Sequence, residues 1–333
     1  MMQKVLLLGA NGQVGRALAK ELGPSALALT RSQLDLADTD QIVSRLHEIV
    51  GELGSQESGT ASSECSPIAA VINAAAYTAV DRAESENELA QGINGLAPGE
   101  IARFCREIDV PMVHFSTDYV FNGNGDLPWT EDMPTDPLNF YGSSKLAGEK
   151  AVEGSGAKYF IFRTSWVFDE DGQNFVNTML RLGKERSALK IVADQFGAPS
   201  YAGDLATATL QALAQVGRVS FERLAPWSRS LKFVRGDCRQ QKKFDEIPSG
   251  VYHLCNDGVT TWYDFAKQIF SLARENEQSL KMESLDPIAA SEFPTPAKRP
   301  HNSRLSTEKI RSTFGFYLRP WEEALKVCLH NKW

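Results

Sequence analysis

The stretch VLLLGANGQVGRALAKEL, residues 5–22, decides the fold of this 333-residue chain. An apolar run is followed by three glycines and then by a segment whose apolar residues have helical spacing. Glycines between a strand and a helix let the backbone turn tightly and approach a pyrophosphate, which the helix N-terminus favours. We therefore predict a strand over residues 5–9, a helix over residues 15–22, and a dinucleotide-binding turn that includes Gly9, Gly12, Gln13, Val14 and Gly15.

The rest of the N-terminal half repeats this alternation of short apolar runs and helix-like segments. Strands that alternate with helices indicate a parallel sheet with helices on both faces. We predict an α/β protein with a Rossmann-like doubly wound parallel sheet and a smaller C-terminal substrate-binding lobe. The expected strands are residues 26–30, 69–74, 110–116 and 159–164, and the expected helices are residues 39–50, 88–105 and 141–153.

The pattern loosens after residue 165, and proline clusters appear. We expect an NAD(P)-binding domain over residues 1–165, interleaved with a lobe formed mainly by residues 166–333. Residues 52–67 are small and polar, which predicts a mobile surface loop. Residues 217–250 mix aromatic and basic side chains, and are a solvated family-specific loop, an ordered excursion or a partner-binding loop.

The composition is ordinary for a globular protein, with 42% hydrophobic and 23% charged residues. A net charge of −7 provides no basic field for nucleic acid or for an anionic membrane surface. The apolar run near the N-terminus is too short for a signal peptide or a membrane span. The five cysteines are scattered without CxxC spacing, which argues against a disulfide framework and a zinc site and favours a cytoplasmic location.

A phenol and an ammonium lie four residues apart in YGSSK, residues 141–145, so a helix would place both on one face. The pKa of a free tyrosine, about 10, is too high for proton exchange at neutral pH, and an adjacent cation favours the phenolate. Tyr141 and Lys145 are therefore candidate catalytic residues for reducing a carbonyl. Thr117, at the end of a predicted strand, is the candidate third member because a hydroxyl there can hydrogen-bond a carbonyl oxygen. The alternative role for Thr117 is a turn cap.

The second strand ends at LTRS, residues 29–32, without the acidic residue that holds the ribose 2′-hydroxyl in NAD binders. Arg31 can face a 2′-phosphate and Thr30 offers a hydroxyl, which favours NADPH, with NADH as a second cofactor. The alternative is a solvated Arg31. Asp35 and Leu36 are candidates for the adenine edge. Small residues at the end of the next strand let a cofactor lie close to the backbone, although close packing against a helix would also explain them. The candidates on that strand and the following one are Ala75, Ala76, Tyr77, Thr78 and Phe115.

Seven stretches together resemble the extended short-chain dehydrogenases/reductases, and within them the dTDP-4-dehydrorhamnose reductase family. They are GANGQVG (9–15), VINAAAYTAVDRAE (71–84), FSTDYVFNGNG (115–125), YGSSKLAGEK (141–150), FRTSWVF (162–168), DQFGAPS (194–200) and PTPAKRPHNSRL (294–305). The resemblance covers nearly the whole chain outside the two insertions. It implies NAD(P)H-dependent reduction of the 4-keto group of dTDP-4-dehydro-L-rhamnose to dTDP-L-rhamnose.

The same resemblance implies roles for single residues. Tyr141 donates the proton to the sugar O4, and Lys145 binds the nicotinamide ribose and lowers the pKa of Tyr141. Thr117 hydrogen-bonds the carbonyl oxygen, and Thr117, Asp118 and Trp166 contact the sugar.

The resemblance also bears on the charged groups of the substrate and on metals. Arg299, with Lys298 and the backbone around Asn302, meets the substrate diphosphate. Some family members are dimers bridged by magnesium through carboxylates, but the matching positions here read Arg16-Ala17 and Ala202-Gly203, with Asp204 offset by one. We therefore expect no required metal, and a metal-bridged homodimer is doubtful.

Two other functions fit the same motifs. The scaffold also serves other nucleotide-sugar reductases and epimerases, because a fold fixes neither the sugar nor the outcome. The regulatory β subunit of methionine adenosyltransferase keeps the cofactor fold without catalysis, although it lacks the RTSW stretch at residues 163–166.

Overall fold

The computed structural model describes residues 3–56, 66–219, 231–233 and 247–333. The strands are β1 (Lys4–Leu8), β2 (Ala26–Leu29), β3 (Ile68–Asn73), β4 (Met112–Thr117), β5 (Tyr159–Thr164), β6 (Val167–Phe168), β7 (Ala188–Val192), β8 (Phe196–Gly197), β9 (Ser200–Tyr201), β10 (Leu231–Phe233), β11 (Gly250–His253), β12 (Thr260–Thr261), β13 (Ser284–Ile288) and β14 (Phe316–Leu318). The α-helices are α1 (Gln13–Leu22), α2 (Ile42–Gln56), α3 (Val80–Ala83), α4 (Asn87–Gln91), α5 (Ala97–Glu107), α6 (Phe140–Glu153), α7 (Phe175–Glu185), α8 (Ala202–Gln215), α9 (Trp262–Glu275), α10 (Glu308–Phe314) and α11 (Trp321–Lys332). Short 3₁₀ turns cover Gly23–Ser25, Thr39–Gln41, Asp118–Val120 and Ala290–Glu292, and a π-helical turn, Gly92–Leu96, joins α4 to α5.

Six strands form one parallel sheet in the order β11-β5-β4-β3-β1-β2. This confirms the predicted α/β class and the doubly wound sheet. The inner strands β3 and β4 are buried at every position, which explains why β3 reads as an apolar run rather than as an alternating pattern. The strand order reverses at β1, whose neighbours are β2 and β3. Ligands of open α/β sheets bind at such a reversal, at the carboxyl ends of the strands.

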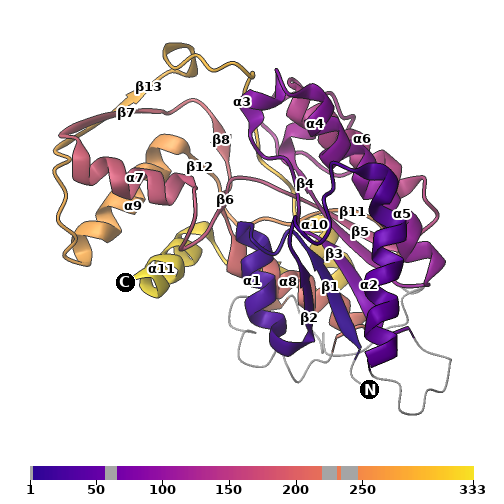
Figure 1. The fold of residues 1–333 in the computed structure, drawn as a ribbon. Coiled ribbons are helices and arrows are strands. Elements are labelled where there is room, and N and C mark those ends of the chain that lie inside the picture. The colour runs from indigo at the N-terminus through magenta and orange to yellow at the C-terminus, as the bar shows by residue number, and fades with distance from the viewer. Residues whose placement is uncertain (1–2, 57–65, 220–230, 234–246) are drawn as a thin grey trace.

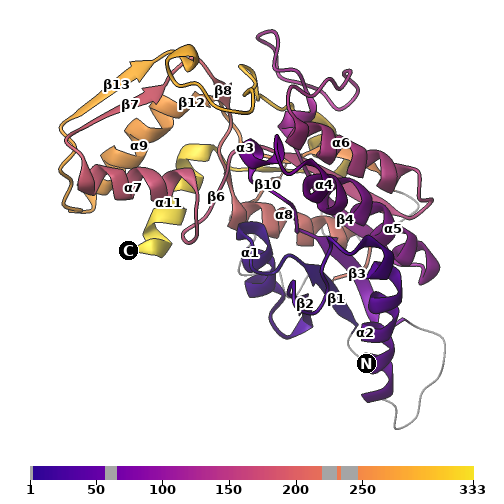
Figure 2. The same cartoon turned by 45° about the horizontal axis from the view of Figure 1, so that its top comes forward.

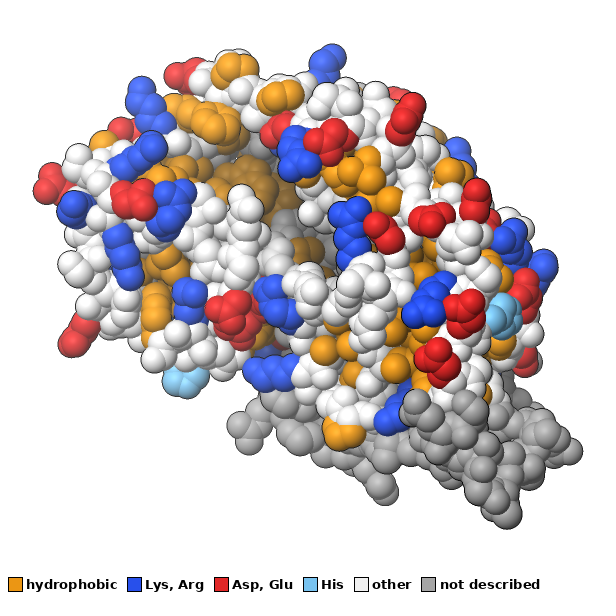
Figure 3. Space-filling model, viewed as in Figure 1, with side chains coloured by type: hydrophobic (Ala, Val, Ile, Leu, Met, Phe, Trp, Pro, Cys, Tyr) orange, Lys and Arg blue, Asp and Glu red, His pale blue; other side chains and the backbone are white. Residues whose placement is uncertain are grey.

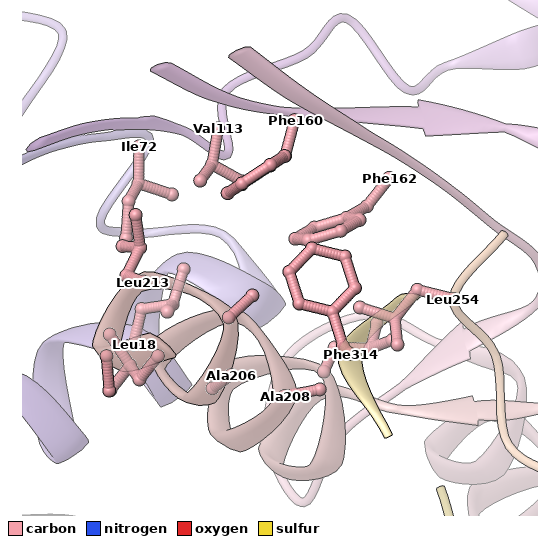
Figure 4. Packing of buried hydrophobic residues seen from close by; sticks show 14 of the residues in the cluster. Leu18, Ile72, Val113, Phe160, Phe162, Ala206, Ala208, Leu213, Leu254 and Phe314 are labelled. Atoms are coloured by element: carbon pink, nitrogen blue, oxygen red, sulfur yellow. The ribbon is translucent and has the colours of Figure 1, made fainter. Parts of the chain in front are cut away.

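The sheet separates two apolar cores. On one face, α1 and α8 pack against the strands together with α10 and β14, and Figure 4 shows Leu18 and Leu213 turned toward Ile72 while Phe314 lies beside Phe162. On the other face, α2, α5 and α6 cover the sheet. α8 is buried along nearly its whole length, so it is a central helix of the large lobe.

The large lobe takes elements from both halves of the chain. β11 pairs with β5, with Gly250 opposite Phe160 and His253 opposite Arg163. Both β11 and α8 fall within residues 166–333, the range assigned mainly to the substrate-binding lobe. The chain therefore crosses between the lobes several times, and residue 165 marks only the first crossing.

The smaller lobe consists of α7, α9, α11 and the parallel ribbon of β7 and β13, on the left of Figures 1 and 2. It has an apolar core of its own, built around Phe168, Phe265 and Leu325. The space-filling view in Figure 3 shows a hollow between this lobe and the large one. Within the described residues, no helix has the length and apolar character needed to cross a membrane.

One predicted loop boundary is wrong. The chain enters α2 through the 3₁₀ turn Thr39–Gln41, and α2 then continues to Gln56, into the expected surface loop at 52–67. The helix is longer because Ile49 and Leu53 extend its apolar stripe onto the core of the sheet. The rest of the loop, residues 57–65, lies outside the described residues, as do residues 220–230 and 234–246 of the second insertion. Between those two ranges, β10 pairs antiparallel with β14.

Candidate functional site

The glycine turn joins β1 to α1. Gly9 has a φ of +78°, a backbone conformation that L side chains rarely adopt. A Cβ atom on Gly15 would overlap the carbonyl oxygen of Gly9, so α1 approaches the turn more closely than a larger residue permits. Gly12, Gln13 and Val14, at the start of α1, line an open cleft. The first backbone amides of a helix favour a pyrophosphate, so the residues present fit a dinucleotide.

Replacing Gly15 by Ala is expected to weaken both folding and cofactor binding. The new methyl group overlaps the backbone of Gly9, and overpacking of this kind costs about 1–3 kcal/mol. Chemical denaturation and NADPH fluorescence titration measure the two effects. The matched control is Gly51→Ala on the exposed face of α2, where an added Cβ meets open space; it should be neutral or stabilising. Equal behaviour of the two variants would contradict the close approach.

A cleft of about 470 Å³ opens at the carboxyl ends of β1, β3 and β4. Among the residues predicted from the sequence, its lining includes Gly9, Gly12, Gln13, Val14, Ala75, Ala76, Thr78, Phe115, Tyr141 and Lys145. The lining residues that sequence reasoning missed are Asn11, Arg16, Ala74, Ser116, Thr164, Val167, Gly172 and Gln173. Asn11 and Ala74 lie inside motifs that were recognised. Gly172 and Gln173 come from the loop after β6, and only the folded chain brings that loop to the cleft.

The first turn of α6 is capped by Asn139, whose side-chain oxygen accepts a hydrogen bond from the backbone N–H of Gly142 at 2.8 Å. This cap fixes the start of the helix that carries Tyr141 and Lys145. Lys145 is 2% exposed, and its Nζ donates to the carbonyl oxygen of Phe115 at 2.6 Å. Burial lowers the pKa of Lys145 to about 8, and the charge of Glu149 opposes this fall.

The pKa of Tyr141 moves in the direction opposite to the one predicted. Burial raises the pKa of Tyr141 above its ordinary value, the charge of Asp118 adds to the rise, and Thr117 opposes it. A neighbouring cation would lower this pKa, but desolvation of the phenolate raises it and is the largest effect on Tyr141. The side chain is therefore held as a neutral phenol, the form that can donate a proton.

Thr117 and Asp118 form a buried pair at the end of β4. The Thr117 hydroxyl donates to Oδ1 of Asp118 at 3.0 Å and accepts the backbone N–H of Tyr119 at 3.2 Å. Burial raises the pKa of Asp118 to about 6. The hydroxyl is thus a cap in this structure, and it must release Asp118 before it can donate to a carbonyl oxygen.

One turn after Lys145, Glu149 of α6 pairs with Arg163 of β5. Two hydrogen bonds of 2.9 and 2.6 Å join the guanidinium to the carboxylate, and the two side chains are only 5% and 2% exposed. The guanidinium also lies over the ring of Phe121 at 5.1 Å. This ion pair ties α6 to β5 and thereby fixes the helix that carries Tyr141 and Lys145.

The residues predicted to contact the adenosine end lie outside the cleft lining. Arg31 is exposed and its Nε pairs with Oδ2 of Asp35 at 3.1 Å, while the Thr30 hydroxyl donates to Gln33. Leu36 is packed into the core beside α2. Tyr77 also lies outside the lining: its hydroxyl donates to Glu86 at 2.6 Å, and its backbone N–H and carbonyl are both hydrogen-bonded to the side chain of Asn94.

Trp166 and Arg299 are held by partners that the sequence did not reveal. Trp166 has a φ of +48°, a strained conformation for a bulky residue, and its ring stacks on Trp262 at 3.6 Å. Trp262 begins α9, so this stack joins the two lobes. Arg299 pairs with Asp81 of α3 at 2.9 Å.

The residues at the family's metal-bridging positions have other partners. Arg16 pairs with Asp169 at 2.9 Å, and Asp204 is buried against Arg319 and Asn256. Within the described residues, no group of three or more His, Cys, Asp or Glu side chains could hold a metal ion.

A parallel doubly wound sheet, a glycine turn that fits a dinucleotide, and a buried Tyr and Lys on the helix over the same cleft define an NAD(P)H-dependent oxidoreductase of the short-chain dehydrogenase/reductase class. Comparisons with known proteins identify a single family within this class. The profile of the family described as "RmlD substrate binding domain" matches residues 2–224 and 227–332, and the chain belongs to this family.

Relatives of known name agree over the full length. The chain is 40% identical over 327 residues to dTDP-4-dehydrorhamnose reductase of Escherichia coli K12, covering 98% of this chain and 97% of that protein. It is also 40% identical over 332 residues to the reductase of the same name from Burkholderia thailandensis, covering 98% of each. A crystal structure of dTDP-4-dehydrorhamnose reductase from Bacillus anthracis in complex with NADP has a TM-score of 0.79 at 32% identity, covering 99% of this chain and all of that one.

Proposed function

We propose that this protein reduces the 4-keto group of dTDP-4-dehydro-L-rhamnose with NADPH and produces dTDP-L-rhamnose. The observation that carries the proposal is the single cleft that combines the glycine turn with Tyr141 and Lys145 in a chain belonging to the RmlD family. The relative from Bacillus anthracis supports NADP as the cofactor, because its structure contains it.

The bound cofactor supplies a hydride to the carbonyl carbon, and the side chains supply the rest. Tyr141, neutral because it is buried, donates its proton to the developing alkoxide at O4. Thr117 turns from Asp118 to hydrogen-bond the same oxygen, where negative charge builds up. Lys145, which lines the cleft together with Tyr141, binds the nicotinamide ribose of the cofactor.

The nucleotide sugar contacts side chains that lie between the two lobes. The rings of Trp166 and Trp262 offer an apolar face to the sugar or the base. Arg299 is 21% exposed and can exchange its partner Asp81 for an oxygen of the diphosphate. Its guanidinium thereby supplies a local positive charge in a protein of net charge −7.

The decisive test is NADPH oxidation with dTDP-4-dehydro-L-rhamnose, made in situ from dTDP-glucose by the dehydratase and the epimerase. We expect turnover that depends on the sugar and gives dTDP-L-rhamnose as product. NADPH binding without turnover would contradict the proposal and would favour another nucleotide sugar or a regulatory subunit.

Arg31 should decide the preference for NADPH. We expect Arg31→Ala to raise KM for NADPH by about 10- to 100-fold, the value of a charge-assisted hydrogen bond to the 2′-phosphate, and to leave KM for NADH unchanged. Initial rates with each cofactor measure this difference. The control is Arg103→Ala, another exposed arginine paired with an acidic neighbour, on α5. An equal loss with both cofactors would show that Arg31 acts elsewhere.

A further inference from the structure

Three buried polar side chains are hydrogen-bonded in a row beside the cleft, one each from β3, β4 and α6. Asn73 ends β3 and lies opposite His114 in the sheet register, and both side chains are fully buried. The side-chain nitrogen of Asn73 is 3.2 Å from Nδ1 of His114. Nε2 of the same ring is 3.4 Å from Nζ of Lys145. Asn73 and His114 lie behind the residues that line the cleft, so they act on the chemistry only through Lys145.

The backbone determines which end of the Asn73 side chain faces the ring. Its Oδ1 accepts the N–H of Ala75 at 3.1 Å, so a flipped amide would place two donors against each other. The nitrogen of Asn73 therefore donates to His114, and Nδ1 of the ring must accept. Burial lowers the pKa of His114 well below its ordinary value, and the charge of Lys145 adds to this effect. The ring is neutral, so its one proton is on Nε2.

The proton on Nε2 points at Lys145. An ammonium group has no lone pair and cannot accept it, whereas a neutral amine can. The titratable and charged groups around Lys145 are His114 from β4, and Tyr141 and Glu149 from α6; Arg163 of β5 already holds Glu149. On the sheet side, Lys145 thus faces the N–H donor of His114 as well as the carbonyl oxygen of Phe115, to which Nζ donates at 2.6 Å. The carboxylate of Glu149, which favours the charged form of Lys145, is already paired with the guanidinium of Arg163.

We propose that Asn73 and His114 are positioning residues that hold an N–H donor against Lys145 and so favour its neutral amine. The proposal rests on the role proposed above for Lys145. When Tyr141 has given its proton to the carbonyl oxygen, a phenolate remains. Lys145 returns one proton to it through an intervening hydroxyl or water and becomes an amine. The Nε2–H of His114 then donates to the lone pair of the Lys145 amine. This state lasts until a proton from solvent converts the amine back to an ammonium.

The tautomer can be measured without turnover. Nitrogen NMR on the protein labelled at its five histidines distinguishes protonated from unprotonated ring nitrogens, and His114→Phe identifies the signal of His114. We expect a protonated Nε2 and an unprotonated Nδ1 at neutral pH. A protonated Nδ1 would overturn the proposal. Because this readout needs no substrate, it separates a failure of this inference from a failure of the proposed reaction.

Kinetics test the coupling to Lys145. Asn73→Asp keeps an acceptor for the Ala75 N–H but accepts from Nδ1, which reverses the tautomer and turns Nε2 into an acceptor for the ammonium. The pKa of Lys145 should rise, so the alkaline limb of the kcat–pH profile should move up by about one unit or more. Asn73→Ala, which also removes the donor to Nδ1, should move the limb in the same direction and serves if the aspartate variant misfolds.

The control is His47→Gln, a partly exposed histidine paired with Glu107 away from the cleft. Its kcat–pH profile should match that of the unsubstituted protein. An unmoved alkaline limb in a variant whose reversed tautomer NMR has confirmed would overturn the link between His114 and Lys145.

Discussion

Tyr141→Phe is expected to lower kcat by about 10²- to 10⁴-fold, the usual contribution of a general acid, and to leave NADPH binding nearly intact. The phenol is buried and its pKa is raised, so it is a proton donor in the neutral form. The phenylalanine ring keeps the edge contact with Tyr119, whose centroid is 5.6 Å away. The loss should therefore be chemical rather than structural. Steady-state rates and fluorescence titration with NADPH measure the two quantities.

Tyr263→Phe is the matched control. This tyrosine is in α9 of the smaller lobe and its hydroxyl donates to the carbonyl oxygen of Leu285, so its loss should leave kcat unchanged. If Tyr141→Phe retained full turnover, Tyr141 could not be the proton donor. If it lost NADPH binding as well, the side chain would have a structural role in the cleft.

Arg163→Ala is expected to destabilise the fold by about 3–5 kcal/mol, the usual cost of removing one partner of a buried ion pair. The carboxylate of Glu149 would be left 2% exposed and without its guanidinium. Because the pair joins α6 to β5, activity should fall together with stability. Urea denaturation at neutral pH gives the free energy of unfolding.

A double variant separates the ion pair from packing. Arg163→Met combined with Glu149→Leu removes both charges and should recover most of the lost stability, since apolar replacement of a buried pair is often neutral. The surface control is Arg181→Ala, which breaks an exposed pair with Glu185 and should change stability by less than about 1 kcal/mol. A small effect of Arg163→Ala alone would mean that water or another group satisfies Glu149.

The sequence by itself determined the local parts of the site. Gly9 and Gly15 predict the turn because the demand for a left-handed φ and close helix approach is local, and the structure has both features. The spacing of Tyr141 and Lys145 predicts one helical face, and both line the cleft. The apolar runs predicted the sheet because strands buried on both faces have no solvent-facing positions to interrupt them.

The tertiary structure alone decided the environment of these residues. Asn73 is the last residue of β3 and His114 lies inside β4, and only the register of the two strands brings the Asn73 amide and Lys145 to opposite sides of the His114 ring. The stack of Trp166 on Trp262 and the arrival of Gly172 at the cleft depend on how the chain crosses between lobes. The pKa of Tyr141 depends on burial, which a four-residue spacing does not encode. Local chemistry follows from sequence because it requires only neighbouring residues, whereas desolvation and long-range pairing require the packed whole.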